Sequence, residues 1–169
     1  AEKLGHIKYH NLLNDFFDDI NDSIIFSKGE IYQYIGDEVT VSWIMKNGIE
    51  NENCLRCFFS ILDEIKNKSL LYQERYELIP EFKAGLHCGD VTVGEVGVVK
   101  KEIVFTGDVL NTTARIQEMC NTYNVNLLIS EKLINQLLID NKYSKKAVGE
   151  ITLRGKQTSN VLYNLEELK

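Results

Sequence analysis

The sequence lacks any long apolar run and any surplus of positive charge. No stretch of about 18 apolar residues occurs, which excludes a membrane-spanning helix. With 19 Lys+Arg against 25 Asp+Glu the net charge is −6, so no cation surplus exists to neutralise the phosphates of a nucleic acid. We therefore expect no nucleic-acid partner and no membrane contact by this domain. A small anionic ligand stays compatible with this balance, because it needs only a few local cations.

Proline is nearly absent, with Pro80 alone, and the chain has no repeat, linker or low-complexity segment. At 44% hydrophobic and 26% charged residues the composition is that of a folded domain, and 169 residues fit one domain with a sizeable core. The chain begins at Ala1 with neither an initiator Met nor a signal peptide. We expect residues 1–169 to be a single domain that is truncated at its N-terminus.

Cysteine is sparse, and only Cys54 and Cys57 form a C-x-x-C pair. No second pair stands at the spacing of a zinc site. The two cysteines continue an apolar helical stripe with Ile61 and Ile65. We interpret them as half-buried helix thiols in a reducing compartment, which favours a cytoplasmic location; a metal or redox role is the alternative.

Hydrophobic periodicity indicates an α+β chain. Apolar residues at three- and four-residue steps predict a helix over 7–26, and a second helix is expected over 51–77. Between them, β-rich runs on either side of Gly36-Asp37 predict a hairpin over 30–43. Further along, the pattern predicts strands at 82–99, 103–105 and 125–129, helices at 107–121 and from Ser130, and two short strands within 149–165. The order predicts a ferredoxin-like βαββαβ sheet with helices on one face and a C-terminal hairpin, its first strand missing upstream of Ala1.

Four segments carry glycine and polar residues in distinctive patterns: Tyr34–Asp37, Ala84–Gly97, Thr106–Ile116 and Gly149–Lys156. Taken together and in this order, they resemble the catalytic domain of class III adenylate/guanylate cyclases, and the resemblance covers essentially the whole chain. It implies the class III cyclase fold and conversion of ATP to 3′,5′-cyclic AMP and pyrophosphate with Mg²⁺ or Mn²⁺, two ions per site. It also implies a homodimer with shared active sites, and upstream regulatory domains in the parent protein.

The reaction spreads negative charge over phosphoryl oxygens, so a site needs divalent cations and a positioned cationic side chain. The resemblance assigns metal binding to Asp37 at the hairpin tip, although most Gly-Asp pairs are plain turns. Asn111 and Arg115 stand four apart, which places them on one helix face, one turn apart. By resemblance Asn111 orients the ribose and Arg115 stabilises the transition state, with Asp37 coming from the other chain; a solvated helix face is the alternative.

The positions that select the base depart from the family pattern. Family members that use adenine carry Lys and Asp or Thr there, and guanylate members carry Glu and Cys, whereas this chain has Gln33 and Val104. Gln33 can donate and accept hydrogen bonds, but Val104 offers contact only. We expect a weak preference for ATP. The departure also favours the alternative function, a catalytically inactive dimerisation or nucleotide-sensing module. Lys156 matches a lysine that contacts phosphates, with an ordinary turn lysine as the alternative.

Two further expectations concern the strand-rich middle of the chain. Its glycines at 85, 89, 94 and 97 follow no phosphate-loop fingerprint, so we interpret them as sites of bulging or close backbone packing within the family's dimer-forming region. His87 is expected to be packed rather than catalytic. A second metal-binding Asp would lie on the strand expected upstream, so we expect the fragment alone to be inactive or nearly so.

Overall fold

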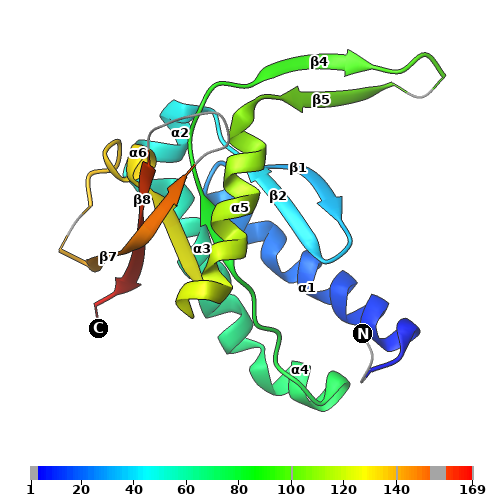
Figure 1. Ribbon diagram of the computed structural model, residues 1–169. Helices are drawn as coiled ribbons and strands as arrows, with labels where there is room; N and C mark the ends of the chain where they lie inside the picture. The colour runs from blue at the N-terminus through cyan, green and yellow to red at the C-terminus, as the bar shows by residue number, and fades with distance from the viewer. Residues whose placement is uncertain (1–3, 100, 140, 153–158, 169) are drawn as a thin grey trace. The chain divides into compact units, whose positions relative to one another are not determined.

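The chain divides after Glu81 into two units, Ala1–Glu81 and Phe82–Lys169. The computed structural model describes residues 4–99, 101–139, 141–152 and 159–168 (Figure 1). Among these residues, no helix has both the length and the apolar character that crossing a membrane requires. Helices and strands alternate along both units, which confirms the predicted α+β class.

The first unit is built on the helix α1 (His6–Phe26), which confirms the helix predicted over 7–26. Its apolar face packs against α3 (Asn53–Asn67), and Ile20 and Ile24 are each only 1% exposed. The strands β1 (Glu30–Ile35) and β2 (Glu38–Ser42) form the predicted antiparallel hairpin, and β1 packs against α1 (Figure 1).

The segment predicted to be helical over 51–77 is helical, but it is divided into two helices. After α2 (Met45–Ile49) and a short 3-10 turn (Glu50–Glu52), the segment forms α3 and a separate α4 (Ser69–Tyr76). The break lies at Lys68, whose ψ of 7° is not helical. No proline or glycine marks this position. Its ammonium group donates to Asp19 on α1 at 2.7 Å.

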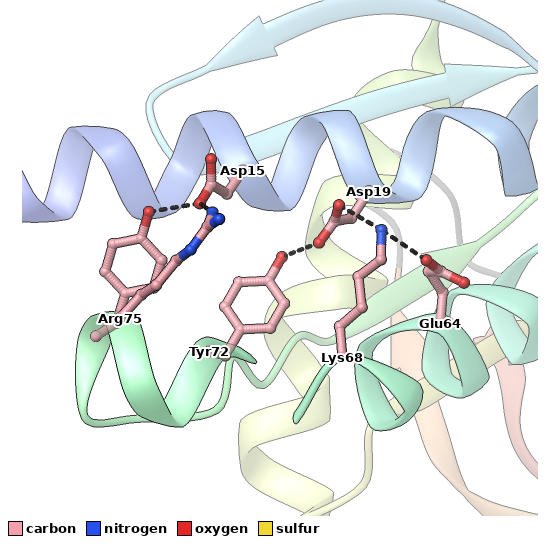
Figure 2. Close-up of polar contacts among 7 residues, drawn as sticks. Asp15, Asp19, Glu64, Lys68, Tyr72 and Arg75 are labelled. Carbon is pink, nitrogen blue, oxygen red and sulfur yellow. Dashed lines mark hydrogen bonds and ion pairs between the residues drawn. The ribbon is translucent and has the colours of Figure 1, made fainter. Parts of the chain in front are cut away.

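Polar contacts tie α4 to α1 (Figure 2). The hydroxyl groups of Tyr72 and Tyr76 donate to the carboxylates of Asp19 and Asp15, each at 2.6 Å. The hydrogen bonds that Lys68 donates to Asp19 and Glu64 raise its pKa to about 12. The bond that Tyr76 donates to Asp15 holds the pKa of that carboxyl below its usual range. We call the set Asp15, Asp19, Lys68, Tyr72, Arg75 and Tyr76 the α1–α4 clasp. Among the described residues, the clasp included, every buried side-chain nitrogen or oxygen atom has a hydrogen-bond partner.

The second unit holds a four-stranded sheet in the order β3 (Ala84–Leu86), β6 (Leu127–Ser130), β8 (Ser159–Glu167) and β7 (Tyr143–Thr152). The pair β3–β6 is parallel and the other pairs are antiparallel. The helix α5 (Asp108–Tyr123) packs on this sheet, and the short α6 (Glu131–Ile134) follows β6 directly. The core between α5 and the sheet contains Ile116, Cys120, Leu128 and Leu162, all fully buried.

The C-terminal hairpin is longer than predicted. Its first strand begins at Tyr143, which pairs with Glu167, instead of at Gly149. The pairing register shifts between Ala147 and Gly149. Such an irregularity interrupts the alternation of side chains between the two faces, so the sequence does not show a period of two over this strand. The predicted turn around Lys156 lies outside the described residues.

The strands β4 (Thr92–Val96) and β5 (Glu102–Thr106) form a separate two-stranded antiparallel ribbon (Figure 1). All five residues of β4 are exposed. The exposed apolar side chains of the ribbon and its loop are Val93, Val96, Val98, Val99 and Ile103. Two strands alone have no partner surface on which to bury such side chains.

Candidate active site

The tip of the β1–β2 hairpin presents Asp37. Ile35 pairs with Glu38, so Gly36 and Asp37 form a two-residue loop. Gly36 has φ of 62°, the positive value that a type II′ turn requires at the first loop position and that glycine adopts without cost. The tight turn leaves the Asp37 side chain exposed on a short, rigid connection.

Tyr9 on α1 holds the Asp37 carboxylate. Its hydroxyl donates to Oδ2 of Asp37 at 3.2 Å. Burial, then the bond to Asp37 and its negative charge, raise the pKa of Tyr9. A phenol is a hydrogen-bond donor at neutral pH even without this shift. The sequence does not predict this contact, because no local pattern links two residues that are 28 positions apart.

Gln33 follows an irregularity in β1. Ile31 pairs with Val41 but Gln33 pairs with Thr40, so the register shifts by one residue at Tyr32. A bulge of this kind re-aims the side chains that follow it. Gln33 is half-buried and lies on the same hairpin as Asp37, so the structure brings these two predicted site residues together on one element.

Asn111 and Arg115 lie in the first half of α5, as predicted. Asn111 is exposed and Arg115 is half-buried, whereas Thr112 and Ile116 of the same turns are buried against the sheet. Within the described part of the chain, neither Asn111 nor Arg115 makes a side-chain hydrogen bond or ion pair. Their donors are therefore available to a ligand that approaches this face of α5.

Val104 lies on β5, opposite Gly94 in the ribbon, and is half-buried. The chain passes from this strand through Gly107 into α5, so Val104 belongs to the same unit as Asn111 and Arg115. Asp37 and Gln33 belong to the other unit. Lys156, the remaining predicted site residue, lies outside the described residues.

A divalent cation fits Asp37 as one ligand among several. No group of three or more His, Cys, Asp or Glu side chains that could hold a metal occurs in the described ranges. Mg²⁺ does not need such a cage, since it is usually held by one or two carboxylates together with water and substrate phosphates. An exposed carboxylate with one oxygen already fixed by a donor suits that mode.

Other reactive side chains are occupied by packing. Cys54 and Cys57 are buried and form no disulfide, and burial raises the pKa of Cys57, which disfavours the reactive thiolate. His87 is half-buried, with Nδ1 at 2.7 Å from Oγ of Ser130. Ser130 also accepts a bond from the backbone N–H of Leu133, at the start of α6. These contacts support the structural interpretation of all three side chains.

Comparisons with known proteins give one consistent result. The model of the family described as "Adenylate and Guanylate cyclase catalytic domain" matches residues 2–167. Among curated proteins, adenylate cyclase 2 of Rhizobium meliloti (strain 1021) is 31% identical over 156 residues, which are 92% of this chain and 43% of that protein. Retinal guanylyl cyclase 2 of Mus musculus is 27% identical over 164 residues, 93% of this chain and 14% of that protein. The chain thus spans less than half of the length of these relatives.

Solved structures show the same fold. A bacterial light-regulated adenylyl cyclase has a TM-score of 0.80 and 21% identity, over 97% of this chain and 46% of that chain. The adenylyl cyclase CyaB from P. aeruginosa also has a TM-score of 0.80, with 18% identity over 99% of this chain and 87% of that chain. These matches confirm the fold class that the sequence predicts.

Proposed function

This chain belongs to the adenylate and guanylate cyclase catalytic domain family, and we propose that it converts ATP to 3′,5′-cyclic AMP and pyrophosphate at sites shared by two copies. The proposal treats residues 1–169 as one catalytic domain. Adenine as the base is supported by the names of relatives, since the curated protein at 31% identity is an adenylate cyclase.

The observation that carries the proposal is the Asn111–Arg115 pair. Among the described residues, Arg115 and Asn111 make no side-chain hydrogen bond or ion pair. No buried side-chain nitrogen there lacks a partner, so the donors of both residues face solvent and are open to a ligand. A triphosphate and a ribose hydroxyl supply the acceptors that the two side chains lack.

The chemistry uses these donors directly. The ribose 3′-oxygen loses its proton and forms a bond to the α-phosphorus, while the bond from that phosphorus to the β-phosphate oxygen breaks and releases pyrophosphate. Arg115 neutralises the charge that builds on the phosphoryl oxygens, where a pre-positioned donor has its largest effect. Asn111, one turn earlier on α5, holds the ribose so that the 3′-oxygen is aligned for attack.

Asp37 is the residue that we assign to metal binding. A bound Mg²⁺ or Mn²⁺ supplies charge neutralisation for the triphosphate and for the attacking oxygen. Because Asp37 sits on a two-residue turn, its carboxylate is presented with little conformational freedom to lose.

A homodimer is supported by the β4–β5 ribbon. Val98 is 94% exposed, and Val93 and Val96 are each more than half exposed. An apolar ribbon of this kind gains stability when a second surface covers it. A second copy of this chain is the partner that we propose, with Asp37 from one protomer and the α5 pair from the other.

A second candidate function, a cyclase-like module that binds nucleotide without turnover, is favoured by Gln33 and Val104. A site discriminates strongly between bases only when the wrong base leaves polar groups of the site unpaired. Val104 has no polar side-chain group that a wrong base could leave unpaired. The base preference of an active enzyme is therefore expected to be modest.

The test is a turnover assay of the full-length protein with ATP or GTP and Mn²⁺, in which cyclic nucleotide is quantified by chromatography. We expect cyclic AMP to exceed cyclic GMP, and Arg115→Ala to lower the rate by about 10²–10³-fold. Glu118→Ala is the matched control, because Glu118 is exposed on the same helix. Nucleotide binding without product would establish the second candidate, and equal loss in both variants would remove Arg115 from the site.

A further inference from the structure

The hydroxyl of Tyr9 contacts the one carboxylate that the proposed function assigns to metal binding. The two residues come from different elements, the N-terminal part of α1 and the tip of the β1–β2 hairpin, within the same unit. A hydrogen bond between such distant residues persists only if the packing around it fixes both elements.

A second contact between α1 and the hairpin provides that packing. The rings of Phe17 and Tyr34 lie with centroids 4.6 Å apart. Phe17 follows Tyr9 by eight residues, about 12 Å along a helix at ~1.5 Å per residue. Asp37 lies in the loop that follows β1, two residues beyond the end of the strand at Ile35. The two contacts thus join α1 to the hairpin at two places, one on the strand and one at the tip.

The geometry of the contact leaves room for a cation. Tyr9 donates to Oδ2 of Asp37, so Oδ1 of the exposed carboxylate stays open to a ligand. A phenol donates its proton and cannot replace the carboxylate as a metal ligand at neutral pH. Its effect is to stop rotation of the carboxylate, as outer-shell donors do around metal ligands.

We propose that Tyr9 is a positioning residue that holds the Asp37 carboxylate in the orientation that binds the divalent cation. The inference rests on the proposed function, because it takes Asp37 as a metal ligand. It adds a residue that acts through Asp37 and touches neither the nucleotide nor the reacting atoms.

The test is Mn²⁺ binding to the full-length protein in the presence of a non-reactive ATP analogue, followed by the electron paramagnetic resonance signal of free Mn²⁺. Tyr9→Phe should weaken Mn²⁺ binding about 10–100-fold, the usual cost of losing an outer-shell partner. Tyr34→Phe is the matched control, because the Tyr34 hydroxyl makes no hydrogen bond within the described residues and the ring contact with Phe17 is kept. Thermal unfolding of each variant checks that the fold is unchanged.

The Asp37→Asn variant separates the inference from the proposed function. If Asp37→Asn weakens Mn²⁺ binding and Tyr9→Phe adds nothing in that background, the two residues act together as proposed. If Asp37→Asn weakens binding but Tyr9→Phe behaves like Tyr34→Phe, the positioning role is overturned and the metal assignment stands. Unchanged binding in Asp37→Asn overturns both, and tighter binding in Tyr9→Phe would show that Tyr9 competes with the cation.

Discussion

At the scale of single residues, the position of α5 depends on glycines that face it. A Cβ atom on Gly85 would lie 2.6 Å from the backbone nitrogen of Gln117 and 2.8 Å from the carbonyl oxygen of Thr113. A Cβ atom on Gly149 would collide with the hydroxyl of Tyr123 at the other end of the helix. The interpretation of Gly85 as a point of close backbone packing is thus confirmed, and the helix that carries Asn111 and Arg115 is seated on it.

Gly85→Ala should therefore destabilise the protein. The clash is with helix backbone, which cannot rotate away as a side chain can, so the helix must move off β3. We expect the free energy of unfolding to fall by about 1–3 kcal/mol, as for other overpacked cores.

Urea unfolding followed by circular dichroism measures this loss. Gly94→Ala is the control, since a Cβ atom there meets nothing within 4 Å. Equal stability of the two variants would mean that α5 is not held against β3 as described.

At the scale of elements, the α1–α4 clasp holds α4 against α1 by hydrogen bonds. Asp15 and Asp19 are one turn apart on α1, and Tyr72 and Tyr76 are one turn apart on α4, so the two pairs meet in register (Figure 2). Tyr72 is only 2% exposed, and burial followed by its bond to Asp19 raises its pKa. The clasp fixes α4 through buried hydroxyl groups as well as through exposed charges.

Tyr72→Phe should lower the free energy of unfolding by about 1.5–3 kcal/mol, the usual value for a hydrogen bond to a charged acceptor. A double-mutant cycle with Asp19→Asn isolates the pair, and its coupling energy should exceed about 0.5 kcal/mol.

Tyr34→Phe removes a hydroxyl that makes no hydrogen bond among the described residues and should change stability little. A coupling energy near zero between Tyr72 and Asp19 would show that Lys68 alone holds the Asp19 carboxylate.

Elements with local signals were predictable, and elements fixed by distant contacts were not. The hairpin was predicted because Gly36-Asp37 is a turn signal that interrupts two β-rich runs. The break at Lys68 was missed because no proline or glycine marks it, and the contact that Lys68 makes there is with Asp19, 49 positions away in the chain. The early start of β7 was missed because the irregularity between Ala147 and Gly149 hides the period of two.

The same distinction holds for the candidate site. The spacing of Asn111 and Arg115 predicted their common helix face, and the structure places both in α5. Tyr9 was not predicted as a site residue, because only the packing of α1 against the hairpin brings its hydroxyl to Asp37. The metal, base and phosphate roles of the predicted residues stay predictions.

At the scale of the whole molecule, the proposed site needs two copies. Asp37 and Arg115 belong to different units of the chain, and the proposal takes them from different protomers. In a dimer with two-fold symmetry, each of two shared sites then receives Asp37 from one copy and Arg115 from the other.

Mixing Asp37→Ala and Arg115→Ala proteins, each inactive alone, should therefore restore cyclic nucleotide synthesis. One site of a mixed dimer collects both substitutions and the other collects none, so each mixed dimer should have about half of the wild-type activity. The rate of the mixture should be well above that of either variant alone, since loss of Arg115 lowers the rate by about 10²–10³-fold. Subunit exchange is verified with two affinity tags, and exchanged dimers that stay inactive would show that the site does not combine the two protomers.

The exposed valines of the β4–β5 ribbon have a consequence for how the rate of cyclic nucleotide synthesis depends on the protein concentration. If the ribbon joins the two copies, dilution separates them, and below the dissociation constant the rate of synthesis rises with the square of the protein concentration. Tethering two copies by short flexible segments raises their effective concentration to the order of millimolar. Any event that changes the distance between two tethered copies would then change cyclic nucleotide output without touching a single residue of the site.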